Sequence, residues 1–251
     1  MRILAIDGSG LVASVAVTSE GELLGEYTTN FKKTHSETLL PMVDELVSML
    51  EIDLSSIDAI AVAGGPGSFT GLRIAAATAK GLGMALAKPI VSVPTVDGMA
   101  YNLWGSSNMV CPIMDARRGQ VYTGLYVFDK DGNMNSVLPQ CADSFEHLAE
   151  IINEKGMSVT FLGDGVPVFK EEIAKLITVP YTFAPANMNR QRAASIAAYA
   201  EVLYSAGQFE SAAEHRPIYL RQSQAERELA EKQAADGKAE AVSMDNPEDN
   251  K

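Results

Sequence analysis

The chain has 251 residues, of which 47% are hydrophobic, and its formal net charge at pH 7 is −12. This length and apolar content allow one large domain or two smaller lobes, each with its own core. The negative charge repels phosphate backbones at long range, so it argues against a protein that binds nucleic acid unaided.

Hydrophobic patterning and turn residues predict the elements in chain order. The first series comprises strands at 2–7, 12–18 and 22–28, a helix at 35–50, a strand at 57–63, a helix at 70–87, a strand at 90–93 and a helix at 95–103. Ser36 is the expected N-cap of the first helix, because its hydroxyl can accept a hydrogen bond from a free backbone N–H. The second series comprises a hairpin of 109–115 and 120–128, a helix at 143–153 capped by Asp143 or Ser144, a strand at 158–162 and helices at 168–176 and 193–205.

The order of the first series predicts the fold class. Three hairpin strands followed by alternating helices and strands form one lobe of an actin-like ATPase, sugar-kinase or heat-shock-ATPase domain, whereas a doubly wound sheet alternates from the start. We therefore predict an α/β, two-lobed, actin-like (ASKHA) fold. Its expected parts are a first lobe at 1–105 against which helix 191–206 packs, a second lobe at 106–190, a C-terminal segment at 207–221 and an acidic, largely disordered tail at 222–251.

Two glycine-containing turns, residues 7–10 (DGSG) and 64–71, follow predicted strands and invite a phosphate-binding interpretation. We call residues 7–10 the first turn. Residues 64–71 (GGPGSFTG) join a strand to a helix, where backbone N–H groups can hold an anion. Alternatively, both turns are tight backbone connections that bind no ligand. We favour that second interpretation, because residues 64–71 lack the Lys-Ser/Thr of a P-loop. The phosphate-loop candidates are Asp7, Gly8, Ser9, Gly65 and Gly67.

The first predicted helix is apolar over more than the usual third of its surface. Leu39, Val43 and Leu46 form one stripe, and neighbouring leucine and methionine side chains widen it. Packing on two sides within the monomer would explain this pattern, and so would a subunit interface, which we favour because methionine adapts to partner surfaces.

The second predicted helix carries small residues, including Gly71, Ala75, Ala79 and Gly83, that would let another helix approach closely. Each interior glycine costs about 1 kcal/mol relative to alanine, which close packing can offset. We therefore predict that the two helices pair with two helices of another chain, and that Leu46→Glu abolishes binding but leaves the monomer folded. The predicted contact residues are His35, Leu39, Met42, Val43, Leu46, Arg73, Ala76 and Lys80.

The sequence offers no catalytic constellation and no metal or cofactor site. None of the three histidines is spaced with another histidine or a cysteine as metal ligands are. We expect His147 to be exposed and His215 to lie in a loop. Cys111 and Cys141 are too few for a disulfide framework and are typical of small buried hydrophobes in a reducing cytoplasm.

Five segments together resemble the bacterial tRNA threonylcarbamoyladenosine biosynthesis family TsaB (YeaZ), over nearly the whole chain up to residue 226. They read RILAIDGSG, KKTHSETLLPMVDEL, AVAGGPGSFTGLRIAAATAKGLGMAL, MDARRGQVYTGLY and PIYLRQSQAE. The resemblance implies a two-lobed actin-like fold and a non-catalytic scaffold that is a paralogue of the catalytic subunit TsaD.

The resemblance also implies partners. The family binds TsaD through its first two helices and forms homodimers through the same surface. With the ATPase subunit TsaE, the complex modifies the adenosine beside the anticodon of tRNAs that read A-starting codons, so this chain would meet tRNA only indirectly.

Residues 95–99 (TVDGM) stand where the catalytic relative has a metal-binding His-Leu-Glu-Gly-His segment. Thr95 is a poor ligand, and Met99 is too soft for a hard ion. This departure favours a non-catalytic subunit. The alternatives are an independent ATP-dependent enzyme of the actin-like superfamily and a metalloprotease-like hydrolase of the glycopeptidase type.

Overall fold

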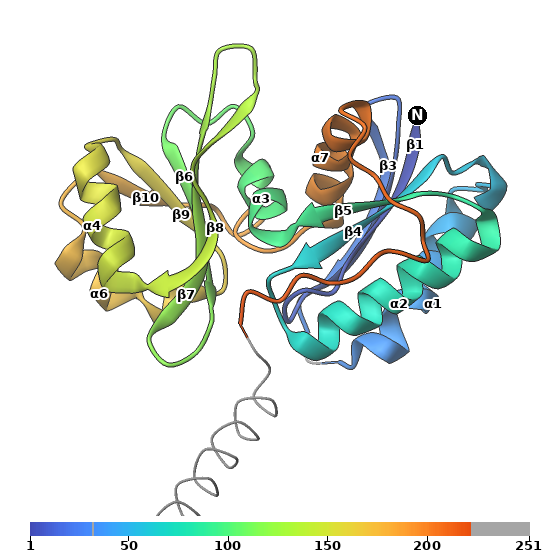
Figure 1. Cartoon of the computed structure of the whole chain (residues 1–251), viewed down its shortest axis with the longest axis horizontal. Coiled ribbons are helices and arrows are strands. Elements are labelled where there is room, and N and C mark those ends of the chain that lie inside the picture. Colours follow the sequence, from blue (N-terminus) through green and yellow to red (C-terminus); the bar gives the residue numbers. More distant parts are fainter. Residues whose placement is uncertain (32, 222–251) are drawn as a thin grey trace, which may run out of the picture. The chain divides into compact units, whose positions relative to one another are not determined.

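The computed structural model describes residues 1–31 and 33–221, which build two five-stranded mixed sheets (Figure 1). The first sheet has the order β3-β2-β1-β4-β5, with β1 Arg2–Asp7, β2 Ala13–Ser19, β3 Glu22–Thr29, β4 Ala59–Gly65 and β5 Ile90–Pro94. The second has the order β10-β9-β6-β7-β8, with β6 Met109–Asp115, β7 Gln120–Phe128, β8 Met134–Ser144, β9 Val159–Leu162 and β10 Tyr181–Phe183.

The two sheets share one topology. In each, three consecutive strands form an antiparallel meander, and two later strands add in parallel on the other side of the first strand. Numbered from its own first strand, each sheet therefore reads 3-2-1-4-5. This duplicated arrangement confirms the predicted actin-like fold.

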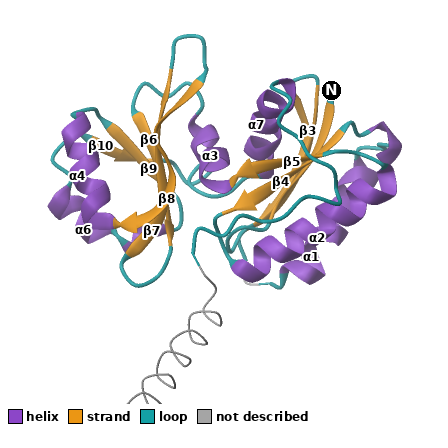
Figure 2. Cartoon of the chain, in the orientation of Figure 1, coloured by secondary structure: helices purple, strands orange, loops and turns teal. Residues whose placement is uncertain are grey.

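Helices cover both faces of the first sheet (Figure 2). On one face lie α1 (His35–Met49) and α2 (Phe69–Leu86), which share a core with Leu4, Ile6 and Val15 of the sheet. On the other face lies α7 (Ala193–Ser205), whose Ile196 packs on the opposite side chains of β1, β4 and β5. The sheet is buried on both sides, so its strands β1 and β4 read as continuous apolar runs.

The second sheet has its own core and shorter helices. The helices α4 (Phe145–Lys155), α5 (Gly165–Val168) and α6 (Lys170–Leu176) follow its strands, and Phe145 of α4 is fully buried against them. The helix α3 (Thr95–Ala100) precedes the sheet and continues into the 3₁₀ turn Tyr101–Leu103. A further 3₁₀ turn, Leu54–Ser56, precedes β4.

The N-termini of α1 and α4 can be compared with the N-caps predicted from the sequence. Ser36 is not the N-cap of α1, because the helix already begins at His35 and the cap position falls on Thr34, which makes no side-chain cap bond. Ser144 caps α4 as predicted, since its Oγ accepts a hydrogen bond from the backbone N–H of His147 at 3.2 Å.

Among the described residues, no helix combines the length and apolarity needed to cross a membrane. The predicted tail at 222–251 lies outside the described residues.

Candidate functional site

The two glycine-containing turns lie side by side, because they follow the neighbouring parallel strands β1 and β4. The backbone N–H of Ser68 donates to the carbonyl oxygen of Ser9 at 2.6 Å. A Cβ atom at Gly67 would overlap that same carbonyl, and one at Gly71 would overlap the carbonyl oxygen of Gly8. Glycine is thus required because the two backbones touch.

Several backbone donors that could cradle a phosphate are already used within the chain. The N–H of Gly65 donates to Thr95 Oγ1 at 3.2 Å, and the N–H of Gly71 faces Ser68 Oγ at 3.4 Å. The N–H of Ser9 donates to Asp7 Oδ1 at 2.8 Å. An anion at these turns would have to displace internal hydrogen bonds, so the geometry supports a packing role for the phosphate-loop candidates.

A C-terminal segment also covers the turn after β4. The N–H of Ile218 donates to the carbonyl oxygen of Gly64 at 2.7 Å. Gly65 has φ +113°, and a Cβ atom there would overlap the carbonyl oxygen of Ile218. The place over Gly65 is therefore filled by the chain itself.

Asp7 is buried beneath the first turn and is poorly suited to a cation. Its Oδ1 accepts hydrogen bonds from Ser9 N at 2.8 Å and Ser9 Oγ at 2.7 Å, whereas its buried Oδ2 has no partner. Burial raises the pKa of this carboxyl above its usual value, an effect that the Ser9 bonds and nearby His35 only partly oppose. A metal ligand must be deprotonated, and this environment disfavours the carboxylate.

Residues 95–99, which the sequence analysis compared with a metal-binding motif, are built into the interior. Thr95 and Met99 are fully buried, and Met99 packs with Val110, Met114 and Leu162. Within residues 1–31 and 33–221, no three His, Cys, Asp or Glu side chains gather so that they could hold a metal ion. Thr95 and Met99 therefore serve the packing of the described residues.

The three histidines hold backbone or acidic partners. His35 Nε2 lies 2.8 Å from the carbonyl oxygen of Gly10, so it fastens α1 to the first turn. Exposed His147 pairs with Asp143, whose hydrogen bond and charge raise the pKa of the imidazole. His215 is buried, and its Nδ1 lies 2.8 Å from Glu210 Oε1. No local pattern around His215 indicated this burial.

Both cysteines are free thiols. Cys111 is buried, and burial raises the pKa of its thiol to about 12. Cys141 is half-buried. Asp115, which the sequence places beside two arginines, forms an exposed ion pair with Arg117 at 3.1 Å.

The predicted partner contacts need correction on α1. Leu39, Val43 and Leu46 are at most 2% exposed and pack against the first sheet within this chain. Ala76 of α2 is also buried, at 4%. These four side chains are not available on the surface of the folded monomer, because Leu39, Val43 and Leu46 pack on the sheet and Ala76 is buried on α2.

The small residues of α2 were also misassigned. Ala75 and Ala79 lie in the core, Gly71 touches the first turn, and a Cβ atom at Gly83 would lie 2.9 Å from the Cβ of Ala212. The close approach is made by this chain's own atoms, the carbonyl oxygen of Gly8 at Gly71 and the Cβ of Ala212 at Gly83. The predicted approach of another helix to that face is therefore wrong.

The predicted contact residues that are not buried are His35, Met42, Arg73 and Lys80. Leu40, Met49 and Met84 are 54%, 68% and 66% exposed, and Met42 and His35 are half-buried. Exposed residues recur along α2 every three or four positions, as one face of a helix does, and we call this set the outer stripe. The outer stripe consists of Thr70, Arg73, Ala77, Gly81 and Met84.

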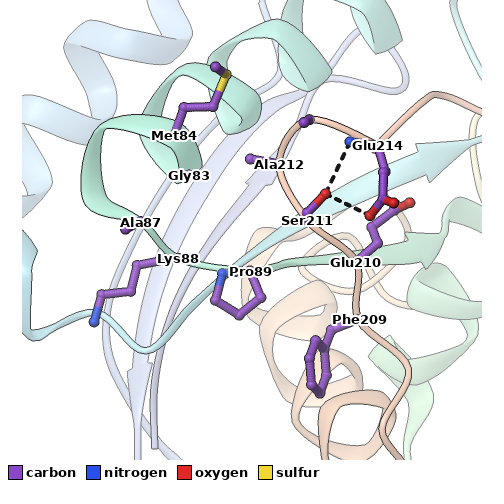
Figure 3. Close-up of a pocket in the computed structure, with 11 residues that line it drawn as sticks. Gly83, Met84, Ala87, Lys88, Pro89, Phe209, Glu210, Ser211, Ala212 and Glu214 are labelled. Carbon is purple, nitrogen blue, oxygen red and sulfur yellow. Dashed lines mark hydrogen bonds between the residues drawn. The ribbon is translucent and has the colours of Figure 1, made fainter.

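Lys80 serves the chain itself. Its Nζ donates to the carbonyl oxygens of Ala213 at 3.1 Å and His215 at 2.9 Å, and so fastens the C-terminal segment to α2. Near the end of α2, that segment and the residues before β5 line a shallow pocket of about 530 Å³ (Figure 3). Two of its polar residues bond to each other, since Ser211 Oγ donates to Glu214 Oε2 at 2.6 Å.

Comparisons with known proteins identify the relatives of this chain. The family model described as "TsaD: tRNA N6-adenosine threonylcarbamoyltransferase" matches residues 22–229. The chain is 34% identical to the tRNA threonylcarbamoyladenosine biosynthesis protein TsaB of Bacillus subtilis over 235 residues, 93% of this chain and all of that protein. It is 36% identical to the TsaB of Escherichia coli over 134 residues, 53% of this chain and 58% of that protein.

A solved structure is similar over almost the same length. The solved structure of YeaZ from Pseudomonas aeruginosa superposes with a TM-score of 0.75 at 27% identity. The superposition covers 87% of this chain and 99% of the other. Sequence and fold therefore point to the same relatives.

Proposed function

The chain belongs to the TsaB (YeaZ) family, which is related to TsaD, and we propose that it is a non-catalytic subunit that docks on a TsaD-type catalytic subunit. The family takes part in the biosynthesis of threonylcarbamoyladenosine in tRNA. The docked complex would place the threonylcarbamoyl group on the adenosine beside the anticodon of tRNAs that read A-starting codons.

The interior of the candidate site supports a role without catalysis. Thr95 and Met99 are fully buried at the positions where the resemblance implies metal ligands in the catalytic relative. The turns after β1 and β4 use their own donors on each other, and Ile218 covers Gly65. A chain that keeps the fold but packs its ligand positions is suited to support a relative that has retained them.

The observation that carries the proposed docking surface is Gly81. It lies in the interior of α2, is exposed, and has no atom of the described residues within 4 Å of where a Cβ would be. Glycine there costs about 1 kcal/mol relative to alanine, and nothing in the described monomer requires it. Close approach by another chain would give this residue a purpose, and Met84, three positions further along the same face of α2 and 66% exposed, would supply apolar contact beside it.

The same surface would serve a homodimer when the catalytic subunit is absent. The ATPase subunit TsaE would then join through the complex rather than through this chain alone. Because the chain carries a net charge of −12, cationic surface for tRNA would come from the partners. Free cysteines suit the cytoplasm, where we place the complex.

A matched pair of methionine substitutions tests the docking surface. Met84→Glu puts a charge on the outer stripe, and Met157→Glu puts the same charge on an exposed methionine between α4 and β9. In size-exclusion chromatography with the TsaD-type subunit of the same organism, Met84→Glu should prevent co-elution and Met157→Glu should not. Co-elution of both variants would refute the proposed surface.

The rival function is an independent enzyme that uses ATP or a metal. Calorimetry of the isolated chain with ATP and Mg²⁺ separates the two functions. We expect no binding in the micromolar range and no turnover. Micromolar binding with ATP hydrolysis would favour the enzyme.

A further inference from the structure

Arg73 is exposed on the outer stripe, yet its guanidinium group is held in one place. Its Cζ lies 3.9 Å from the centroid of the Phe69 ring, and its Nε donates to the hydroxyl oxygen of Tyr219 at 3.3 Å. The rings of Phe69 and Tyr219 are in turn 4.8 Å apart. The guanidinium plane is therefore fixed by one aromatic ring and one hydroxyl group.

Tyr219 reaches this position because the preceding segment is fastened along α2. We call residues 210–219 the strap. Its backbone bonds to Ile90 at one end and to Gly64 near the other, through Glu210 and Ile218. Lys80 holds its middle through two carbonyl oxygens. The strap thus delivers an aromatic hydroxyl to Arg73 from a segment 146 residues away in sequence.

The fixed guanidinium lacks an acidic partner. Among the described residues, no carboxylate forms an ion pair with Arg73, and no hydrogen bond uses its Nη atoms, although the chain carries 32 acidic residues. Immobilising an exposed arginine costs rotamer entropy, which the exposed hydroxyl bond and the contact with the Phe69 ring offset only in part. A planar fork that is already ordered and has free donors is suited to a carboxylate, which it can bind through two parallel hydrogen bonds.

We propose that Arg73 is the receptor for one carboxylate side chain of the docked subunit, and that the strap positions it through Tyr219. This proposal rests on the proposed function, because the acid belongs to the subunit that covers α1 and α2. The alternative of an RNA phosphate backbone is disfavoured by the surroundings. Glu37, Asp44 and Glu45 are exposed on neighbouring α1, whereas binding to a phosphate backbone needs several cations together.

The test is a binding titration of the full-length chain with the TsaD-type subunit at low and high salt. Arg73→Lys keeps the charge but loses the fork, so the dissociation constant should rise at least about tenfold. Tyr219→Phe keeps the ring and removes the hydroxyl, so the dissociation constant of this variant should rise about two- to tenfold. If Tyr219 acts through Arg73, adding Tyr219→Phe to Arg73→Lys should have no further effect.

Arg118→Lys is the matched control, because Arg118 is an exposed arginine on the turn between β6 and β7. Its dissociation constant should equal that of the wild type. Urea unfolding of every variant checks that the monomer remains folded. The expected set is a large effect at Arg73, a smaller one at Tyr219 and none at Arg118.

Other outcomes separate the two proposals. Wild-type affinity in Arg73→Lys, together with lost binding in Met84→Glu, would overturn the receptor but keep the docking surface. Absence of binding by the wild type would overturn both. If neutralising the acids after the strap (E226Q, E228Q and E231Q in the full chain) removes the effect of Arg73→Lys, the carboxylate is intramolecular and the proposal is wrong. A tRNA affinity that only Arg73→Lys lowers would assign the site to phosphate instead.

Discussion

Both sides of α2 contain glycine, but only on one side do contacts within the described residues explain it. On the inner side, Gly71 and Gly83 contact the first turn and the strap so closely that a Cβ would collide or crowd. On the outer side, Gly81 faces no atom of the described residues within 4 Å. The residue type alone does not show whether a glycine of this helix packs inside its own chain or lies on an exposed face.

The same contrast separates the two sides of α1. Leu39, Val43 and Leu46 lie in the core, whereas Leu40 and Met49 are more than half exposed. The wide apolar surface of α1 therefore has two parts, one that packs in the core and one that is exposed to solvent. The inner surface stabilises the fold, and the outer surface is the one available for docking.

The largest expected effect on the free energy of unfolding comes from a comparison of Leu46→Ala with Leu40→Ala. Leu46 is 2% exposed and packs in the core of the first sheet, so its truncation should lower the free energy of unfolding by about 2–5 kcal/mol. Leu40 is 54% exposed, and its truncation should change the free energy of unfolding by no more than about 0.5 kcal/mol. Urea denaturation followed by circular dichroism measures both.

This result also decides the expectation for Leu46→Glu. A charge buried at that position should unfold the monomer, contrary to the sequence-based prediction that binding alone is lost. Equal stability of Leu46→Ala and Leu40→Ala would show that the inner surface of α1 is not core.

A smaller effect is expected from Gly71→Ala on the inner side of α2. The new Cβ would overlap the carbonyl oxygen of Gly8, which is backbone and cannot rotate away. Overpacking of this kind costs roughly 1–3 kcal/mol, so the unfolding midpoint in urea should fall. An unchanged midpoint would mean that the turn after β1 can shift freely, and would remove the packing explanation for these glycines.

Much of the fold could be predicted because the buried strands and helices carry local patterns. The meander and the alternating elements of the first sheet follow from apolar runs and turn residues. The strands β8 and β10 could not be predicted. They are the edge strands of the second sheet, β10 has only three residues, and β8 has no fully buried side chain and contains Pro139.

The candidate site was less predictable, because its decisive contacts join distant segments. Lys80 bonds to Ala213 and His215, and Gly64 bonds to Ile218, across more than 130 residues. No local periodicity encodes such pairs. The sequence could suggest that Arg73 lies on a docking surface, but only the structure shows that Tyr219 holds it.

The smallest expected effect, Gly81→Ala, bears most directly on the contrast between the two sides of α2. The methyl group has space in the monomer and removes the conformational cost of glycine, so the free energy of unfolding should rise by about 0.5–1 kcal/mol. If another chain packs against this position, the same methyl group should weaken binding of the TsaD-type subunit. Denaturation of the monomer and titration of the complex should therefore move in opposite directions. Higher stability with unchanged affinity would leave Gly81 outside the interface, and the outer stripe would then lack the residue that distinguishes it from an ordinary exposed helix face.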